Sequence, residues 1–484
     1  MTATAERPLA RPANRRIPLA AAGRLVRLEL RRNAMLWMLP VVGALFWFLT
    51  YRRSVALPPM WNVRAMSMQG TTIAVFMPTV VGAAAWTGSR EVRRNLTDLL
   101  GVTSRPRWAR QLAAWFATAA WALAGYLVCV GALYAVTARQ AAWGGPLWWP
   151  ATIGAASLPA LAALGVAAGA LVPSRFTPPL AAVGTFVALE ASLELVHSAA
   201  SPGQISPLVA GPWNLGNTEG LATFYRYLPD LPIAQLIFLG GCTAALLGIL
   251  GVPAGAGGRW LRGSAATLAV AGVVAAGSAV GLAGTGHLDP HGMVAIPALH
   301  DAADDRAVPY TPVCSQTAIP ICLHPAYSVY LSALAGALQP VLGDMAGLPG
   351  APARISQAPV TYREHDQGIE AIVSGRSASD VASVYWIVLP NQLAGPSMTV
   401  AESAAAVRER TARGIVAAVI GDGSDQAQRA VTAAILGTDD LPPGSPVAAA
   451  AQRFAALAAA ARHAWLQAHA SDLRAGRIAL EQLP

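Results

Sequence analysis

The chain contains no lysine, and all 34 of its basic residues are arginine. A P-loop needs a lysine that reaches the β and γ phosphates of a nucleotide, so this chain is not itself a P-loop ATPase. It also lacks an H-E-x-x-H sequence, which excludes a standard zincin protease. We find no complete catalytic constellation and therefore expect neither an enzymatic activity nor a bound cofactor.

Charged residues are also scarce, at 12% of the chain, about half the usual share for a soluble protein. Hydrophobic residues make up 54%, which places much of the chain in lipid. Residues 1–286 hold 22 arginines and 8 acidic residues, whereas residues 287–484 hold 12 arginines and 17 acidic residues. The two parts therefore meet different surroundings. We assign the basic part to the membrane surface and expect no nucleic-acid partner.

Seven apolar runs approach the roughly 20 residues that a transmembrane helix needs. They are residues 35–51, 70–87, 111–137, 148–172, 178–197, 231–253 and 265–286. Tryptophan and tyrosine lie near the ends of several runs, as interfacial aromatic residues do. The sequence thus predicts an all-α membrane fold.

The distribution of arginine predicts the orientation. With the N-terminus inside, the inner segments hold 17 arginines and the outer segments between spans hold 5. We therefore expect a multi-pass protein of the plasma membrane, with a cytoplasmic N-terminus and with residues 287–484 outside the cytoplasm. Residues 17–33 predict an interfacial helix on the inner leaflet, where its arginines meet anionic lipid.

Residues 88–110 form a short basic segment between the second and third runs, GSREVRRNLTDLLGVTSRPRWAR. Within it, Val92, Leu96, Leu99 and Leu100 recur at helical spacing, so one face can pack on an apolar partner. One interpretation is a helix that presses on a cytoplasmic partner. The other is a positively charged inner loop without a docking role. Spacing and charge alone do not separate them.

Two carboxylates lie in the fifth run, Glu190 and Glu194, one helical turn apart. Because a carboxylate facing lipid costs a few kcal/mol, we expect them to face other helices or a water-filled path. A role in a translocation path is one hypothesis, and a structural or surface role is the alternative.

Two of the four cysteines, Cys314 and Cys322, lie eight residues apart in a polar segment. If that segment faces an oxidising compartment, they form a disulfide. The alternative is a metal site that includes His324. Similarly, His287, His291 and His300 either bind a metal or belong to an exposed linker. The remaining C-terminal sequence predicts short strands at 360–363, 368–373 and 384–389. It also predicts helices at 325–348, 401–420, 425–436, 446–469 and 473–482.

The first 255 residues resemble the membrane subunit of ABC-2 type transporters, and REVRRNLTDLLGVTSRPRWAR is the matching motif. The resemblance implies six spans, short helices at 198–230 and a coupling helix on which a separate ATPase docks and binds ATP. The docking residues would be Arg90, Val92, Arg93, Arg94, Leu96, Leu99 and Leu100. It also implies a homodimer or a heterodimer with a second permease.

The rest of the chain departs from that plan by adding a seventh span and an outer domain. This part resembles a group of actinobacterial membrane proteins through VCSQTAIPICLHPAY and WLQAHASDLRAGRIALEQLP. We divide the chain into a tail with an interfacial helix (1–34), a six-span permease-like part (35–255), a loop with a seventh span (256–286) and a mostly helical α+β extracytoplasmic domain (287–484). The expected function is an ABC-2 export permease. The alternative is a membrane-anchored extracytoplasmic sensor or binding module without transport.

Overall fold

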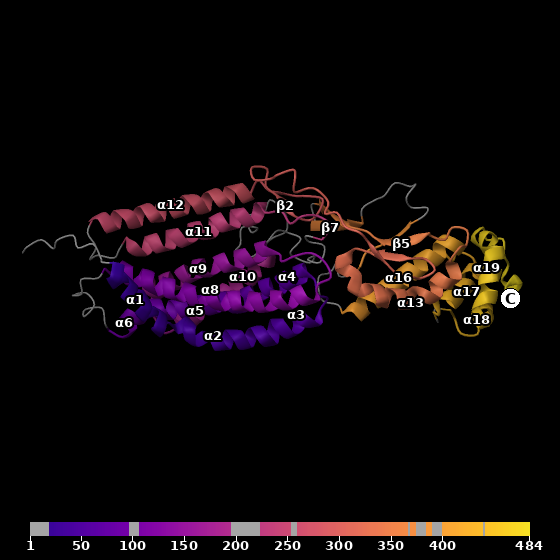
Figure 1. The fold of residues 1–484 in the computed structure, drawn as a ribbon, viewed down its shortest axis with the longest axis horizontal. Helices are drawn as coiled ribbons and strands as arrows, with labels where there is room; N and C mark the ends of the chain where they lie inside the picture. The colour runs from indigo at the N-terminus through magenta and orange to yellow at the C-terminus, as the bar shows by residue number, and fades with distance from the viewer. Residues whose placement is uncertain are drawn as a thin grey trace, which may run out of the picture.

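The computed structural model describes residues 19–95, 106–194, 223–252, 259–365, 368–373, 384–389, 399–438 and 441–484. A long bundle of helices and a C-terminal domain lie end to end in it (Figure 1). We call residues 313–484 the C-terminal domain and residues 284–312 the connector that joins it to the bundle.

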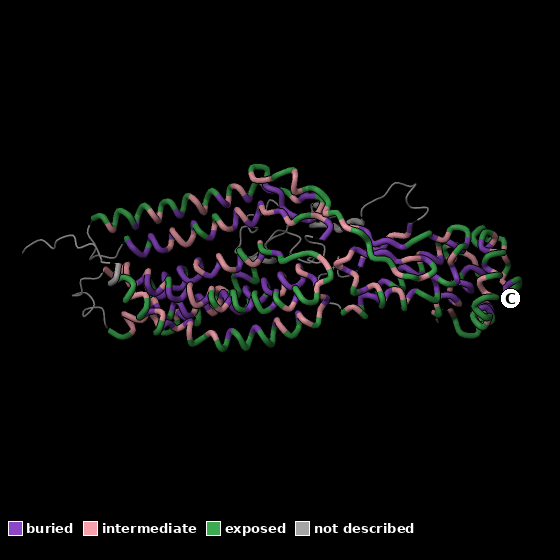
Figure 2. The backbone as a smooth tube through the Cα atoms, in the orientation of Figure 1, coloured by how far each residue is buried: buried purple, intermediate pink, exposed green. Residues whose placement is uncertain are grey.

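Six helical segments among the described residues are long and apolar enough to cross a membrane. They are Ala34–Ala56, Trp61–Gly88, Arg107–Gln140, Trp148–Leu171, Asp230–Gly251 and Arg259–Ala283. Large apolar side chains are exposed on the outside of the bundle, such as Trp37, Leu180 and Val270. Figure 2 shows that α2 (Ala34–Leu45) and α12 (Arg259–Ala283) each have an exposed face on the outside of the bundle. These features indicate a membrane protein.

The six segments correspond to six of the seven expected spans, and the fifth expected span is only partly described. Helix α10 (Thr177–Glu194) covers the described part of that run. Residues 195–197 of the expected span lie outside the described residues.

Two of these spans are built from more than one helical element. The elements are α2, a π-helical stretch at Phe46–Tyr51 and α3 (Arg52–Ala56), then α4 (Trp61–Thr71), a second π-helical stretch at Thr72–Phe76 and α5 (Met77–Gly88). The remaining long helices are α8 (Arg107–Gln140), α9 (Trp148–Leu171) and α11 (Asp230–Gly251).

Small residues let neighbouring helices of the bundle approach closely. On α9, the positions of Gly165 and Gly169 lie directly against backbone atoms of α5. On α11, the positions of Gly241 and Gly248 lie equally close to the backbone of α12. Close backbone approach is the usual basis of helix association in membranes, because lipid gives no hydrophobic force between helices.

Helix α1 (Leu19–Arg32) lies across one end of the bundle and is joined to α8. The indole Nε1 of Trp121 donates to the carbonyl oxygen of Leu30 at 2.8 Å. Asn33 caps α2 by accepting from the backbone N–H of Met35 at 2.9 Å, and its Nδ2 donates to Thr118 Oγ1 at 3.0 Å. We call this end, which also carries the short helix α6 (Arg90–Arg93), the basic end.

The C-terminal domain lies at the opposite end of the bundle (Figure 1). Strands β1 (His287–Leu288) and β2 (Val294–Ala295) pair in the connector. The domain has a four-stranded sheet in the order β3-β4-β5-β8, formed by Val313–Cys314, Ile321–Leu323, Arg354–Gln357 and Val384–Ile387. Strands β6 (Val360–His365) and β7 (Gly368–Val373) form a separate hairpin.

Helices pack on this sheet and close its core. They are a 3-10 helix at Pro325–Tyr330, α13 (Leu331–Met345), α16 (Val400–Ile420), α17 (Gln426–Leu436), α18 (Pro446–Ala456), α19 (Ala459–Arg474) and a 3-10 turn at Leu480–Gln482. The core of the domain includes Val63 of α4, Met60 directly before this helix, and also Phe224. Since these three residues come from the bundle, the domain is packed on the bundle rather than only tethered to it.

Candidate functional site

Helix α6 is fixed to two other helices at the basic end by ion pairs. Arg90 Nη2 lies 2.5 Å from Glu29 Oε1 of α1. Glu91 accepts from Arg110 of α8, at 2.7 Å between Nε and Oε1 and at 3.2 Å between Nη2 and Oε2. The Glu29 side chain is only 8% exposed, so its charge depends on Arg90. A displacement of α6 is therefore resisted by α1 and by the first turn of α8.

The other predicted docking residues in the described part of this segment differ in exposure. The guanidinium of Arg93 lies 3.8 Å from the centre of the Trp86 ring, and its Nη2 donates to the Trp86 carbonyl oxygen at 2.9 Å. Val92 is half-buried, and Arg94 is exposed. Arg94 is thus available to a partner, whereas Arg93 is held against the end of α5.

The expected continuous helix from Arg90 to Leu100 is not what the described residues show. Helix α6 ends at Arg93, and Asn95 adopts a left-handed backbone with φ of 51°. Asparagine tolerates this conformation and often ends a helix. The predicted docking residues Leu96, Leu99 and Leu100 lie outside the described residues, so their docking role stays a prediction.

The sequence analysis missed Glu29 and Glu91 as members of this site. Each is a lone acidic residue within an arginine-rich stretch, RLVRLELRR and SREVRR. That isolation was the available signal, because a single carboxylate among several arginines is well placed to form an ion pair.

A groove of about 1340 Å³ opens beside α6, between α1, α2, α5 and α10. Its lining includes the exposed residues Arg31, Arg32 and Arg94, which we call its mouth, and also Trp37, Pro78 and Ala182, which we count as its walls. The groove therefore combines a basic mouth with apolar walls, a combination that suits an amphiphilic ligand.

Of the two glutamates of α10, the structure describes the side chain of Glu190 alone. Glu190 is exposed on the outside of the bundle, while its neighbour Leu189 is buried in the core. The Glu194 side chain lies outside what the structure describes. The expectation that Glu190 faces other helices or a water-filled path therefore stays a prediction.

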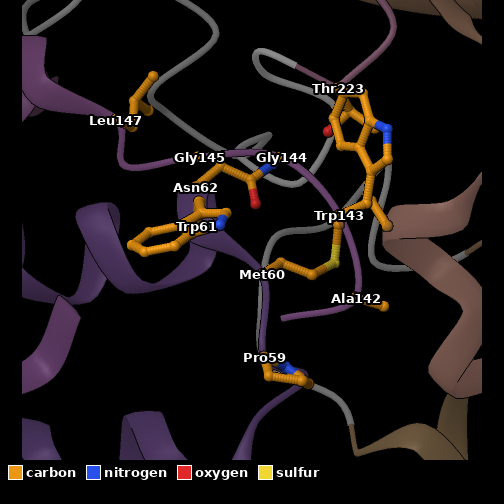
Figure 3. A pocket seen from close by; sticks show the side chains of 11 residues that line it. Pro59, Met60, Trp61, Asn62, Ala142, Trp143, Gly144, Gly145, Leu147 and Thr223 are labelled. Atoms are coloured by element: carbon orange, nitrogen blue, oxygen red, sulfur yellow. The ribbon is translucent and has the colours of Figure 1, made fainter. Parts of the chain in front are cut away.

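A small cavity of about 30 Å³ lies at the junction between the bundle and the C-terminal domain (Figure 3). It lies between the start of α4 and the loop before α9, and Trp61, Asn62 and Trp143 are among its lining residues. A cavity of this size holds one or two water molecules. The described residues of this cavity thus form a closely packed contact between the two parts.

A ring of aromatic residues from both parts surrounds His324 at this junction. The rings of Tyr310, Trp143 and Phe224 have their centres 4.1, 4.4 and 5.0 Å from the imidazole centre. Its Nδ1 accepts from the backbone N–H of Ala326 at 3.1 Å. Burial lowers the pKa of His324 from 6.5 to about 4, so the imidazole is neutral at pH 7.

Cys314 and Cys322 form a disulfide, which confirms that sequence prediction. They are cross-strand partners on β3 and β4. Because both sulfur atoms are bonded to each other, the alternative of a metal site with His324 is wrong. Among the residues that the structure describes, no three His, Cys, Asp or Glu side chains are placed to hold a metal ion.

No protein-family model, no curated protein and no solved structure matches the chain. The similarity of residues 1–255 to ABC-2 permeases therefore remains a prediction from the sequence.

Proposed function

We propose that this chain is the permease subunit of an ABC-2 type exporter, driven by a separate ATPase that docks on the basic end. The supporting observation is the pair of ion contacts that joins α6 to α1 through Glu29 and to α8 through Arg110. If a partner displaces α6, these two ion pairs transmit the displacement to α1 and to α8.

The nucleotide would be bound and hydrolysed by the partner, since this chain has no lysine for a P-loop. Closure of the partner around ATP would shift residues 88–105, and α8 would carry the shift along its 34 residues. Such coupling requires that the partner makes different contacts with two states of the spans.

The docking proposal is tested by co-purification with a P-loop ATPase that lacks spans of its own. The variant Leu96→Asp/Leu99→Asp places two charges on the predicted docking face and should abolish binding. Val329→Asp is a control, since Val329 is exposed in the C-terminal domain. If the ATPase binds the double variant as well as the control, the docking assignment is wrong.

The translocation path would lie between two copies, or between this chain and a related permease. Glu190 supports this arrangement, because it is exposed on the outside of the bundle. A carboxylate that faces lipid costs a few kcal/mol, and a second subunit or a water-filled path between subunits would remove that cost. In this arrangement the basic end faces the cytoplasm, and the C-terminal domain lies outside the plasma membrane.

A membrane-anchored sensor is the second candidate function. The observation that favours it is the shared core, in which Met60, Val63 and Phe224 of the bundle join the C-terminal domain. A ligand that moved the domain would thereby move the start of α4. Truncation after Gly286 separates the two functions, because export that persists without the domain makes the domain accessory, whereas a sensor loses all response.

A further inference from the structure

We propose that the groove at the basic end binds one anionic phospholipid from the leaflet in which α1 lies. The groove measures about 1340 Å³. That is larger than the roughly 300–1,000 Å³ of pockets that bind small molecules, so a larger, elongated ligand fits it better.

The charge at the mouth of the groove selects a negative ligand. The two acidic residues that line it, Glu29 and Glu91, are already paired with Arg90 and Arg110. The other three arginines of the mouth are Arg31, Arg32 and Arg94. These three are exposed and have no ion pair within the described part of the chain. Within the described part of the chain, three guanidinium groups are thus available for a phosphate, for which their geometry is well suited.

The depth of the groove matches one leaflet. Its wall on α5 extends from Thr87 back to Pro78. These nine helical steps span about 14 Å at 1.5 Å per residue, close to half of a hydrocarbon core about 30 Å thick. Trp37 and Trp86 line the same groove and are exposed, as aromatic residues at the headgroup level are. A phospholipid would place its phosphate at the arginines and a chain along α5.

The positive charge of the mouth also disfavours two other occupants of the groove, the N-terminal segment and a second copy of the chain. Residues 1–18 carry four arginines and one glutamate, so the N-terminal segment is repelled by the basic mouth. A second copy of the chain packed here by two-fold symmetry would bring the same arginines against each other. An anionic lipid meets neither obstacle.

The test uses the purified full-length chain without an ATPase, and native mass spectrometry counts retained lipids. The probes are phosphatidylglycerol and phosphatidylcholine. The variant Arg31→Gln/Arg32→Gln removes two charges from the mouth. Its control, Arg24→Gln/Arg27→Gln, removes two exposed charges from the same helix that do not line the groove. We expect the mouth variant to lose selective phosphatidylglycerol binding by about tenfold or more, and the control to retain it.

A second variant tests the apolar wall without changing charge. Ala182→Trp fills the groove, whereas Leu180→Trp changes an exposed residue of the same helix outside the groove. Only Ala182→Trp should lower lipid retention. The result supports a lipid, rather than a free phosphate, if soluble glycerol phosphate fails to compete.

Four results would overturn the proposal. Equal loss in the mouth variant and its control would indicate general adsorption. Retention of selective binding in both groove variants would place the lipid elsewhere. Competition by glycerol phosphate would indicate an anion site without lipid. A change in subunit number without a change in lipid binding would make the groove a subunit contact. Since no ATPase is present, each of these results leaves the docking proposal to be judged separately.

Discussion

Arg90 and Glu29, 61 positions apart in the sequence, form an ion pair of 2.5 Å that joins α6 to α1. The carboxylate is largely buried, and its second oxygen, Oε2, has no hydrogen-bond partner among the described residues. Arg90 is therefore the cation on which the burial of this charge depends. The pair connects the predicted ATPase-docking segment to the helix that lies across the basic end.

Replacing Arg90 alone should destabilise the chain more than replacing both partners. Arg90→Gln leaves the Glu29 charge buried without its cation, which should lower the free energy of unfolding by about 2–3 kcal/mol, somewhat less than for a fully buried pair. Arg90→Gln/Glu29→Gln should recover part of the loss. The exposed Arg94→Gln is the control and should stay within about 0.5 kcal/mol. Thermal unfolding in detergent measures all three, and equal losses in the single and double variants would refute the role of the pair.

Glu190 should be accessible to water in the assembled protein. In a chain with serine at positions 129 and 242, Glu190→Cys should react with a charged maleimide in proteoliposomes. Val183→Cys lies two turns earlier on the exposed side of α10 and should stay unreactive in lipid. Failure of Glu190→Cys to react would show that Glu190 does not line a water-filled path.

Acidification should weaken the junction through His324. Its pKa is lowered to about 4 in the folded chain, so the unfolded chain takes up the proton first as the pH falls. The stability that neutral His324 contributes is complete above about pH 6.5 and is lost between there and about pH 4, by about 3 kcal/mol. His324→Asn keeps a capping acceptor for Ala326 and should be less sensitive to acid.

The measurement for this prediction is the melting temperature of both proteins between pH 7.5 and pH 4. All other ionisable groups are the same in the two proteins, so the difference between their pH profiles reports on His324. Parallel profiles would mean that this imidazole is not buried in a neutral form.

Loss of the disulfide should destabilise the edge of the four-stranded sheet. Cys314→Ser/Cys322→Ser removes a cross-link that closes a short loop, and the expected cost is about 2–3 kcal/mol. A reducing agent should lower the melting temperature of the unaltered chain but leave that of the variant unchanged. If both respond equally to the reductant, the stabilising bond lies elsewhere.

Apolar runs predicted most of the bundle, because length and hydropathy alone identify a span. The second span shows why the predicted ends of the spans differ from the observed ones. The run begins at residue 70, yet α4 begins at Trp61 and includes Asn62, Arg64 and Gln69. These polar residues are buried, and Arg64 donates to Ser54 Oγ at 3.0 Å. Partners from α3 thus allow a polar stretch to continue an apolar helix, which a hydropathy scan cannot detect.

In the C-terminal domain, the sequence pattern likewise predicted some of the elements and missed others. The strands expected at 360–363, 368–373 and 384–389 correspond to β6, β7 and β8, but β3, β4 and β5 were missed because they have only two to four residues each. The helix expected at 446–469 is broken at Leu457, which has extended backbone angles, without a glycine or proline to mark the break. The groove and the aromatic ring around His324 depend on contacts between distant segments, so no local pattern could predict them.

We expect the two ends of the bundle to face opposite sides of the membrane, with the basic end in the cytoplasm. All the proposals above depend on this orientation. Single cysteines at two exposed positions test this, Arg94→Cys at the basic end and Gln452→Cys in the C-terminal domain. An impermeant maleimide should label Gln452→Cys in intact cells and should label Arg94→Cys only after permeabilisation. Labelling of Arg94→Cys in intact cells, or of both positions from the same side, would contradict the account.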